Sequence, residues 1–544
     1  VYTVYSLTQN GFCAANGNGS MDFAASSDAA EAKWLVTKTS DGYVFQSAAH
    51  QTYMTSDAGL SSNAENISIS DLNTSVTDYS VKYDLSALNA LDSLNGIQVI
   101  SRLHTLGLSR SDLMNPEANM TSLNTNIQSA LSGLPTQTVQ YTGTDVDDLN
   151  QFLQNNTGKI VQLTQDIQVY KNTNGSFGII MVPSDTILDG NGHRLVMKAG
   201  YTEAPDVGVV LYVYKDGVIP STNCGVKNLS TDIPYVNSIN VFSADNILLE
   251  NNTLNNATKS GIMISDEYGS TVNGIIRGNT INNVGDDAIA VYGNHSNLLI
   301  DSNRISGAKG FAGIAISCLQ NGQQIRVDNE TTGPHDIIVT GNVISGCSGE
   351  ALYCIGSYKT YITYNTLRDS ILEGVCLDSG CIGNYFAHNE VVNNGIAGGL
   401  PGVSIDNGIY NIVDSNNVYN NSCSGIKLVR TGLGNIIVNN ICTDNAYNQM
   451  GAKSSGIDIE PLAVETENLG YIDGLGSNWN VVLNNTVTGS HDFGVFIADD
   501  DTANNGGSSC ENVIMYNKFS SAYTFGAADF SSMSSTVKNN ITLN

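Results

Sequence analysis

The second half of the chain repeats one short pattern, and this repeat constrains the fold more than any other feature. The pattern is a hydrophobic residue, two variable residues, Asn, one variable residue and another hydrophobic residue, spaced by 22–28 residues in most copies. Its Asn residues are Asn252, Asn279, Asn303, Asn342, Asn365, Asn389, Asn417, Asn439, Asn485 and Asn517. A repeat of this length indicates a solenoid, in which each coil stacks on the previous one.

Each repeat also contains a short phrase that begins with Gly or Ala and alternates hydrophobic with variable residues. Examples are "GIMIS" from Gly261, "AIAVY" from Ala288 and "GIKLV" from Gly425. Period-two patterning over four or five residues predicts β-strands, and no unit has helical spacing. We therefore expect an all-β solenoid, with the repeated Asn in left-handed turns and their amides stacked coil on coil.

Aligning these phrases on their leading Gly or Ala predicts which side chains face outward. One outward column reads Met263, Ala290, Ala315, Tyr353, Cys376, Ser404, Lys427, Asp458 and Phe496. The other reads Ser265, Tyr292, Ser317, Ile355, Asp378, Asp406, Val429, Glu460 and Ala498. Stacked parallel strands lie about 4.8 Å apart, so we expect Asp378 beside Asp406 and Lys427 beside Asp458.

The phrases "SDTILDGNGHRL" (184–195) and "NILLENNTLNNATKSGIMIS" (246–265) resemble the pectate-lyase-like right-handed parallel β-helix superfamily. The resemblance covers roughly residues 140–540, and "DVDDLNQFLQNNTGKIVQLTQDI" (145–167) is similar to the helix and first strand that open such solenoids. It implies a right-handed parallel β-helix that acts on carbohydrates. It does not select a reaction, because the superfamily includes glycosidases, lyases, epimerases, esterases and tailspikes.

The first 135 residues have a different pattern. Residues 1–80 read as a β-rich accessory region, in which 32–57 faintly resembles a ricin-type sugar-binding repeat, and residues 81–135 show helical spacing. Ser86, Ser109 and Thr121 are expected helix N-caps. Residues 136–544 then form the predicted catalytic β-helix. A helical segment followed by a solenoid also resembles the β-helix lacto-N-biosidases of gut bacteria, which names one candidate substrate class.

The composition narrows the class of partner. The chain has 23 Lys and Arg against 51 Asp and Glu, a net charge of −28, which disfavours nucleic acid and anionic membranes. No run of 18 apolar residues is present, so we expect no membrane span. Charged residues make up only 14%, and short polar side chains are abundant, as suits a secreted or cell-surface protein.

Two long insertions, 319–336 and 462–480, follow strands that align in the same sheet. They predict two walls around a trough roughly 20–25 Å long, with Asp378 and Asp406 on its floor. Aromatic residues near this floor are expected to stack on sugar rings. These are Tyr353, Tyr358, Tyr471 and Trp479.

The two Asp residues have a structural and a chemical interpretation. "DSG" and "DNG" form turns, so each Asp alone could be a turn residue. Two like charges on adjacent strands destabilise a sheet, however, and carboxylates about 5–5.5 Å apart suit a retaining glycosidase. Asp458 and Glu460 are further catalytic candidates, or partners of Lys427 and Arg430. Pairing Asp406 with Glu460, about 9–10 Å apart, would suit inversion.

We therefore predict a secreted glycoside hydrolase with Asp378, Asp406, Asp458 and Glu460 as candidate catalytic residues. Lys427 and Arg430 would bind substrate, no cofactor would be required, and Asp286 and Asp287 would be structural. One alternative is a polysaccharide lyase, in which Asp378, Asp406 and Asp458 bind Ca²⁺ while Lys427 or Arg430 abstracts a proton. Another is a non-catalytic carbohydrate-binding surface or tailspike-like protein.

Overall fold

The computed structural model of the chain describes residues 106–171, 178–214, 217–318, 333–446, 455–460, 476–498, 509–520, 525–531, 535–538 and 540–543, together with short strands in the remaining ranges. Contacts divide the chain into two compact units, Val1–Tyr83 and Asp84–Asn544. The boundaries 80 and 135 inferred from the sequence stay predictions. The helical segment that is described, from residue 106, clusters with the solenoid.

The first unit contains two small antiparallel sheets. One has the order β1-β5-β6-β7-β8 and the other β2-β3-β4. Their strands are β1 (Tyr2–Thr3), β2 (Tyr5–Ser6), β3 (Gly11–Ala15), β4 (Met21–Ala24), β5 (Lys33–Lys38), β6 (Tyr43–Ser47), β7 (Tyr53–Met54) and β8 (Leu60–Ser61).

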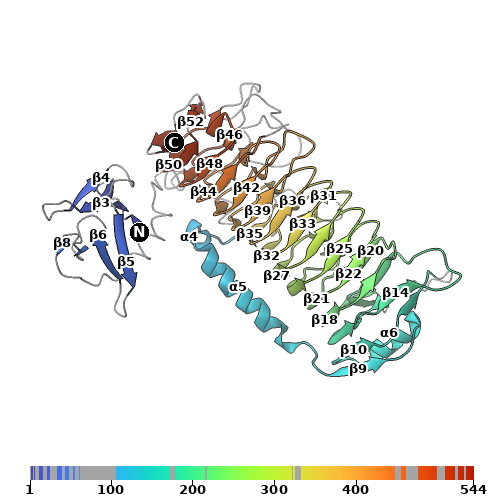
Figure 1. Cartoon of the computed structure of the whole chain (residues 1–544). Helices are drawn as coiled ribbons and strands as arrows, with labels where there is room; N and C mark the ends of the chain where they lie inside the picture. Colours follow the sequence, from blue (N-terminus) through green and yellow to red (C-terminus); the bar gives the residue numbers. More distant parts are fainter. Residues whose placement is uncertain are drawn as a thin grey trace. The chain divides into compact units, whose positions relative to one another are not determined.

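The second unit is a right-handed parallel β-helix, as the sequence predicts, and Figure 1 shows its coils stacked side by side. Each full coil adds one strand to each of three parallel sheets, which we call the first, second and third sheet in chain order. Along a coil the chain passes from the first sheet to the second and third, and then returns to the first sheet of the next coil.

The first sheet has 15 strands. They are β9 (Thr138–Tyr141), β10 (Lys159–Leu163), β13 (Thr186–Asp189), β18 (Thr222–Lys227), β21 (Asp245–Glu250), β24 (Val272–Arg277), β27 (Ser296–Asp301), β32 (His335–Thr340), β35 (Tyr358–Thr363), β38 (Tyr385–Ala387), β41 (Ile412–Asp414), β44 (Ile436–Val438), β47 (Val481–Leu483), β50 (Val513–Met515) and β53 (Thr536–Lys538).

The second sheet has 14 strands. They are β11 (Ile167–Val169), β14 (Arg194–Met197), β19 (Ser230–Thr231), β22 (Thr253–Asn255), β25 (Thr280–Asn282), β28 (Arg304–Ser306), β33 (Val343–Ser345), β36 (Thr366–Arg368), β39 (Glu390–Val392), β42 (Asn417–Tyr419), β45 (Ile441–Thr443), β48 (Thr486–Thr488), β51 (Lys518–Ser520) and β54 (Ile541–Leu543).

The third sheet has 13 strands. They are β12 (Ile180–Met181), β15 (Val207–Val210), β20 (Asn237–Phe242), β23 (Ile262–Ser265), β26 (Ile289–Tyr292), β29 (Ile314–Ser317), β34 (Leu352–Ile355), β37 (Val375–Asp378), β40 (Val403–Asp406), β43 (Ile426–Val429), β46 (Ser455–Glu460), β49 (Phe493–Ala498) and β52 (Phe525–Phe530). Two hairpins project between coils, β16 (Tyr212–Tyr214) with β17 (Val218–Pro220), and β30 (Leu319–Gln320) with β31 (Gln323–Gln324).

The register of the third sheet is the one that the sequence predicts. The side chains assigned to the interior are completely buried in every coil aligned, and they form one continuous core with apolar residues of the other two sheets. They are Ile262, Ile264, Ile289, Val291, Ile314, Ile316, Leu352, Cys354, Val375, Leu377, Val403, Ile405, Ile426, Leu428, Ile457, Ile459, Val495 and Ile497. A slip by one residue would turn these side chains to the surface, so the outward columns are fixed by the same burial.

Helices cover one end and one side of the solenoid. Helix α6 (Val146–Asn155) begins at Asp145, whose carboxylate accepts the N–H of Asp147, and it contacts β11 and β12 of the first coil. Helix α5 (Pro116–Ala130) packs along the first sheet against β24, β27 and β32 (Figure 1). These positions confirm that a helix opens the solenoid.

The expected N-caps have mixed outcomes. Ser109 precedes α4 (Arg110–Leu113), and both its N–H and its hydroxyl donate to Asp112 Oδ2. Thr121 was wrong as a cap, because it lies inside α5 and its hydroxyl donates to the carbonyl of Glu117 within the helix. Ser86 lies outside the described residues.

Buried Asn side chains link successive coils into ladders. In the longest ladder each amide Nδ2 donates to the Oδ1 of the next Asn. Its members are Asn252, Asn279, Asn303, Asn342, Asn365, Asn389, Asn416, Asn440, Asn485, Asn517 and Asn540. The prediction of Asn417 and Asn439 was wrong by one residue, because each has an Asn neighbour that faces inward instead.

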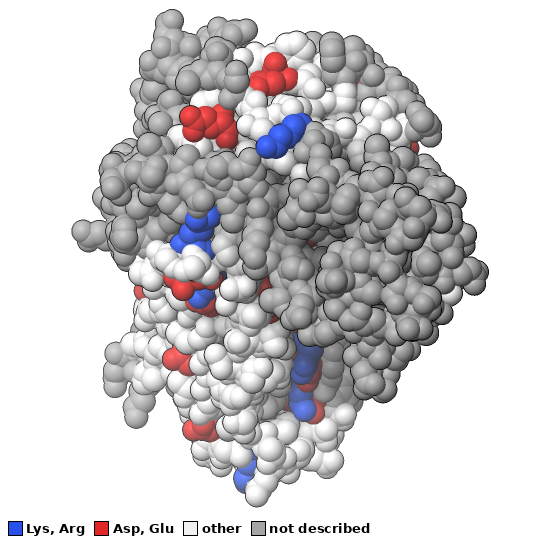
Figure 2. Space-filling view, turned by 90° about the vertical axis from the view of Figure 1, so that its left-hand side faces the viewer, with Lys and Arg blue, Asp and Glu red and all other residues white. Residues whose placement is uncertain are grey.

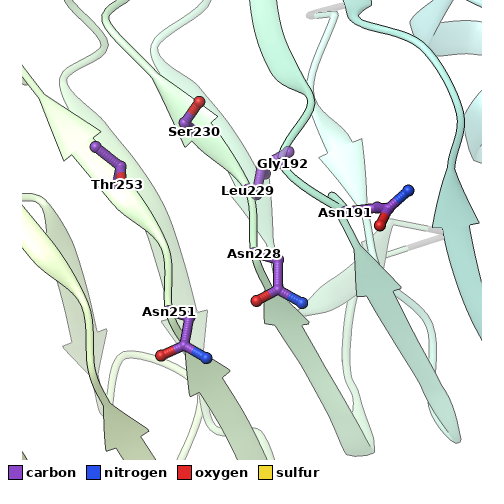
Figure 3. Close-up of a pocket in the computed structure, with 7 residues that line it drawn as sticks. All are labelled: Asn191, Gly192, Asn228, Leu229, Ser230, Asn251 and Thr253. Carbon is purple, nitrogen blue, oxygen red and sulfur yellow. The ribbon is translucent and has the colours of Figure 1, made fainter.

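The left-handed turn is also shifted from the predicted place. The residue before each ladder Asn from Asn252 to Asn517 has positive φ, for example 55° at Asn251 and 58° at Asn439, while the ladder Asn does not. Figure 3 shows this turn on early coils, where Asn191, Asn228 and Asn251 line an open hollow of about 450 Å³. Asn suits both places, since it tolerates left-handed backbone and its amide can donate and accept at once.

The neighbours Asn416 and Asn417 provide a matched pair for testing the ladder. Asn416 is buried and accepts the N–H of Asn389 at 2.9 Å, whereas Asn417 is exposed. We expect Asn416→Ala to lower the free energy of unfolding by roughly 2–4 kcal/mol, because it leaves buried polar groups without partners. Asn417→Ala should change it by less than about 0.5 kcal/mol in the same denaturant titration. Equal effects would contradict this role of the ladder.

Candidate functional site

The candidate site lies on the outer face of the third sheet, on five consecutive strands from β34 to β46. Asp378 at the end of β37 pairs in register with Asp406 at the end of β40. One column further inside the strands, Ser404 pairs with Lys427, and Lys427 pairs with Asp458. The geometry inferred from the repeat is therefore present: two carboxyl groups stand on neighbouring strands of the same face.

The two Asp carboxyl groups have different partners. Asp378 accepts the hydroxyl of Tyr353 at 2.7 Å on Oδ2 and that of Ser379 at 2.8 Å on Oδ1. Tyr353 lies on β34, one coil earlier, and its phenol is largely buried. Burial and the charge of Asp378 raise the pKa of Tyr353 well above its usual value, so this hydroxyl remains a donor. Asp378 is thus oriented by two neutral hydroxyl groups.

One carboxylate oxygen of Asp406 forms an ion pair, and the other has no hydrogen-bond partner among the described residues. Arg430 Nη1 lies 3.0 Å from Oδ2, whereas Oδ1 is buried and without a hydrogen-bond partner. Burial raises the pKa of Asp406 to about 7, and the charge of Asp378 adds to this, while Arg430 opposes it. Arg430 reaches back one coil from the residue after β43, which has the left-handed φ of 60°. The contacts of the pair are therefore asymmetric: two hydroxyl groups donate to Asp378, whereas Asp406 has one guanidinium partner and a raised pKa.

Lys427, Asp458 and Glu460 form a separate ion cluster. Lys427 Nζ lies 3.2 Å from Asp458 Oδ2 and 3.0 Å from Glu460 Oε2. Burial raises the pKa of Asp458 to about 6, against the lowering effect of Lys427. Burial alone would lower the pKa of Lys427, but the charges of Asp458 and Glu460 outweigh it and raise the pKa. Asp458 is only 3% exposed, so this cluster favours a bracing role for it over contact with substrate.

Sequence reasoning missed two glutamates that lie beside the Asp pair. Glu350 and Glu373 stand just before β34 and β37. Burial raises the pKa of each to about 7, with added repulsion from Asp378 on Glu350, and from Glu350, Asp406 and Asp378 on Glu373. The available signal was that "GEALYC" and "LEGVCLD" place Glu directly before the leading Ala or Gly on successive coils.

The predicted aromatic residues are not all brought to this face. Tyr353 does lie on this face. Its ring packs edge to face against that of Phe311, with 4.9 Å between the ring centroids, and Phe311 was not singled out from the sequence. Tyr358 begins β35 in the first sheet and stacks on His335. Trp479 is buried before β47, also in the first sheet, and its indole donates to Glu511. Tyr471 lies outside the described residues.

The walls of the predicted trough are mostly beyond what the structure describes. Both insertions do leave the third sheet, one after β29 and the other after β46. Of the first, the hairpin β30–β31 and residues 333–336 are described, and of the second only residues 476–480. The trough therefore stays a prediction, while its proposed floor is described.

The Ca²⁺ alternative finds no built site among the described residues. Nowhere in that part of the chain do three or more His, Cys, Asp or Glu side chains converge so that they could hold a metal ion. Asp458 lies in a different outward column from Asp378 and Asp406 and contacts Lys427 instead. The three Asp residues proposed as ligands are therefore not brought together.

Comparisons with known proteins agree with this fold. The family model described as right handed beta helix region matches residues 212–332. The chain is a right-handed parallel β-helix protein. This is the fold that the resemblance to the pectate-lyase-like superfamily implies, whereas the narrower resemblance to lacto-N-biosidases stays a prediction. No curated protein matches the sequence.

Several solved β-helix structures are similar to this one at low identity. The A-module of the Azotobacter vinelandii mannuronan C-5 epimerase AlgE6 is 14% identical, with 74% of this chain and 100% of that chain covered and a TM-score of 0.43. A tailspike protein of E. coli bacteriophage HK620, in complex with a pentasaccharide, is also 14% identical, with 72% and 73% covered and a TM-score of 0.44. The Streptococcus pneumoniae surface adhesin PfbA is 12% identical, with 72% and 93% covered and a TM-score of 0.40. These values assign no reaction to this chain.

On the face shown in Figure 2, the described charged side chains do not form one continuous patch. Figure 2 shows one face, on which the described acidic and basic side chains stand in small groups separated by uncharged surface. Among the helices that the structure describes, none has the length and apolar character to cross a membrane. The exclusion of nucleic acid stays a prediction.

The ion cluster generates a stability test. Lys427→Met leaves the buried Asp458 without its cation, so we expect it to lower the free energy of unfolding by roughly 3–5 kcal/mol at pH 8. The loss should be smaller at pH 5, because Asp458, whose pKa is raised, then carries a proton and no longer needs a counter-charge.

The matched control is Lys198→Met, which breaks a pair with Asp145 in which both side chains are about one third exposed, 33% and 32%. Denaturant titrations at both pH values should show little change for this variant. A Lys427→Met loss that is the same at pH 5 and pH 8 would contradict a charge-compensating role.

Proposed function

We propose that this protein is a secreted or cell-surface glycoside hydrolase, whose site is the Asp378–Asp406 pair. The observation that supports the proposal most is the asymmetry of this pair. Two carboxyl groups stand in register on neighbouring strands, one held by hydroxyl groups and the other with a pKa raised to about 7. Two carboxyl groups of different protonation are what glycoside hydrolysis requires.

In the proposed mechanism Asp406 is the acid and Asp378 the nucleophile. Asp406 donates its proton to the glycosidic oxygen as the bond to the anomeric carbon breaks, and Asp378 forms a bond to that carbon. Arg430, 3.0 Å from Asp406, then stabilises the carboxylate that remains. Asp406 next takes a proton from water, and the resulting hydroxide oxygen displaces Asp378. Strand spacing of about 4.8 Å agrees with the short carboxyl separation of retaining enzymes, about 5–5.5 Å.

The remaining candidates have supporting parts in this proposal. Tyr353 orients Asp378, and Lys427 with Asp458 and Glu460 braces the adjoining coil. The lyase alternative is less well supported, because Lys427 is held as a cation by two carboxylates and Arg is always protonated. Neither can take a proton from a sugar at neutral pH.

A secreted or cell-surface location is supported by composition and by the substrate class.

The first test is removal of each carboxylate. Asp378→Asn and Asp406→Asn should each lower kcat by about a thousandfold or more on any glycan that the wild type hydrolyses, measured as released reducing ends. The matched control is Asp414→Asn. Asp414 also ends a strand and accepts the hydroxyl of the following Ser415 at 2.7 Å, but it lies on the first sheet. Hydrolysis that survives both site variants would show that the reaction does not depend on this pair, whereas a wild type that hydrolyses no glycan of the panel would favour a binding protein.

The second test uses pH. Because Asp406 must carry its proton to act as the acid, kcat should fall about tenfold per pH unit above about pH 7. Arg430→Gln removes a charge that lowers the pKa of Asp406. The pH above which kcat falls should therefore become higher in this variant, even though its activity is lower. If the pH above which kcat falls stays the same or becomes lower in this variant, Asp406 is not the acid.

The stereochemistry is tested separately: NMR identifies the anomer that is released first, and a retaining enzyme releases the anomer of the substrate.

A further inference from the structure

Glu350 and Glu373 occupy the same position on successive coils. Register pairs Leu352 with Val375, and the N–H of Ala351 donates to the carbonyl of Glu373 at 3.1 Å. The two glutamates therefore stand one strand spacing apart, about 4.8 Å. At this position the described neighbouring coils carry Ala312 before them and Pro401 after them. An acidic pair on adjacent coils thus occurs at both ends of the strands of this site.

Each glutamate carboxylate interacts with its own backbone N–H, a contact that lowers the pKa less than burial raises it. Glu350 is 6% exposed, and its Oε2 is buried without a hydrogen-bond partner. No ion pair is formed by either glutamate among the described residues, whereas Asp406 has Arg430. An ionised pair here would place two negative charges on adjacent coils without a counter-ion, one on the buried Glu350 and the other on the half-buried Glu373, which is costly. The neutral form of at least one carboxyl group is the stable form.

Both acidic pairs interact electrostatically with Cys376. Burial raises the pKa of this outward thiol, and the charges of Asp378, Glu373, Asp406 and Glu350 raise it further, in that order. Glu350 and Glu373 stand at the amino ends of β34 and β37, and Asp378 and Asp406 at the carboxyl ends of β37 and β40. Cys376 lies between them on β37. A sugar ring placed over Cys376 would have one pair on each side.

We propose that Glu350 and Glu373 hold shared protons and donate hydrogen bonds to the bound sugar, so that the site selects uncharged sugars over uronates. This inference rests on the proposed function, since it concerns the same site. A neutral carboxyl group can donate to a sugar oxygen, while a carboxylate on the sugar would meet four acidic groups. The two cations that the described strands place on this face, Arg430 and Lys427, already contact Asp406 and the Asp458–Glu460 pair.

Other titratable groups surround the pair, and the test has to separate them. Asp378, Tyr353 and Cys347 face Glu350, as does Asp287, whose pKa burial also raises to about 7. Asp378, Asp406 and Cys376 face Glu373. Protein labelled with ¹³C in the side-chain carboxyl of Glu alone allows the infrared band of protonated Glu to be distinguished from that of Asp.

We expect a protonated-Glu band that disappears with a midpoint near pH 7 in the wild type. Glu350→Gln and Glu373→Gln should each weaken it and move the remaining midpoint to lower pH, because repulsion is lost. Glu390→Gln, on the second sheet, should leave it unchanged. Loss of the whole band by about pH 5.5, as for ordinary Glu, would overturn shared protons whatever the enzyme hydrolyses.

Substrate class is tested by binding, so that it does not depend on turnover. The probes are p-nitrophenyl β-galactoside and β-glucoside with their C6 uronate counterparts, titrated calorimetrically into the Asp378→Asn variant. At least one neutral glycoside should bind tenfold or more tightly than its uronate, and lose affinity between pH 6 and pH 8. Glu350→Gln should reduce that pH dependence, since an amide donates at both values. Equal or tighter uronate binding, or binding of no probe, would overturn the selection.

Discussion

The stacking of each coil on the next, at one strand spacing and in one register, is the constraint on which the rest of the structure depends. Apolar side chains on alternate positions fill the interior, and ladders of Asn amides repeat the same contacts at the bends. Each buried amide both donates and accepts, so a coil that shifted by one residue would lose core burial and amide hydrogen bonds together. Register is thereby fixed on the outer face as well, where no packing would otherwise hold charged residues in columns.

Fixed columns explain how a sheet can hold like charges close together. Free strands would slide or turn to separate Asp378 from Asp406, but here the interior neighbours Leu377 and Ile405 hold both strands in place. The repulsion is then relieved chemically, by a guanidinium on Asp406 and by retention of protons. A scaffold stabilised along its whole length can in this way maintain a locally unfavourable group of side chains, as functional sites commonly do.

Sequence reasoning predicted most of the fold and part of the site, and its failures have common causes. Alternation within strands located Asp378, Asp406, Lys427 and Asp458 correctly, since burial enforces it. It could not place residues at bends, where the direction of a side chain is set by local backbone. Asn417 and Asn439 were misplaced for this reason, and Glu350 and Glu373 were overlooked because they precede the strands. Thr121 was misplaced because helix α5 begins five residues earlier, at Pro116. Tyr358 and Trp479 follow turns that lead into another sheet.

The contacts of Lys427 and Arg430 show which carboxyl groups on this face have a cation partner. Lys427 contacts two carboxylates and Arg430 contacts one, while Glu350 Oε2, Asp406 Oδ1 and Asp458 Oδ1 are buried without a hydrogen-bond partner. A carboxyl group that only supports the scaffold gains from a cation partner, as Asp458 and Glu460 do from Lys427. One that must release or share a proton has to be paired incompletely, because a fully compensated carboxylate would stay ionised. Glu350 and Asp406, for which proton chemistry is proposed, each have one unpaired oxygen, and so does Asp458 beside Lys427, whose pKa burial also raises.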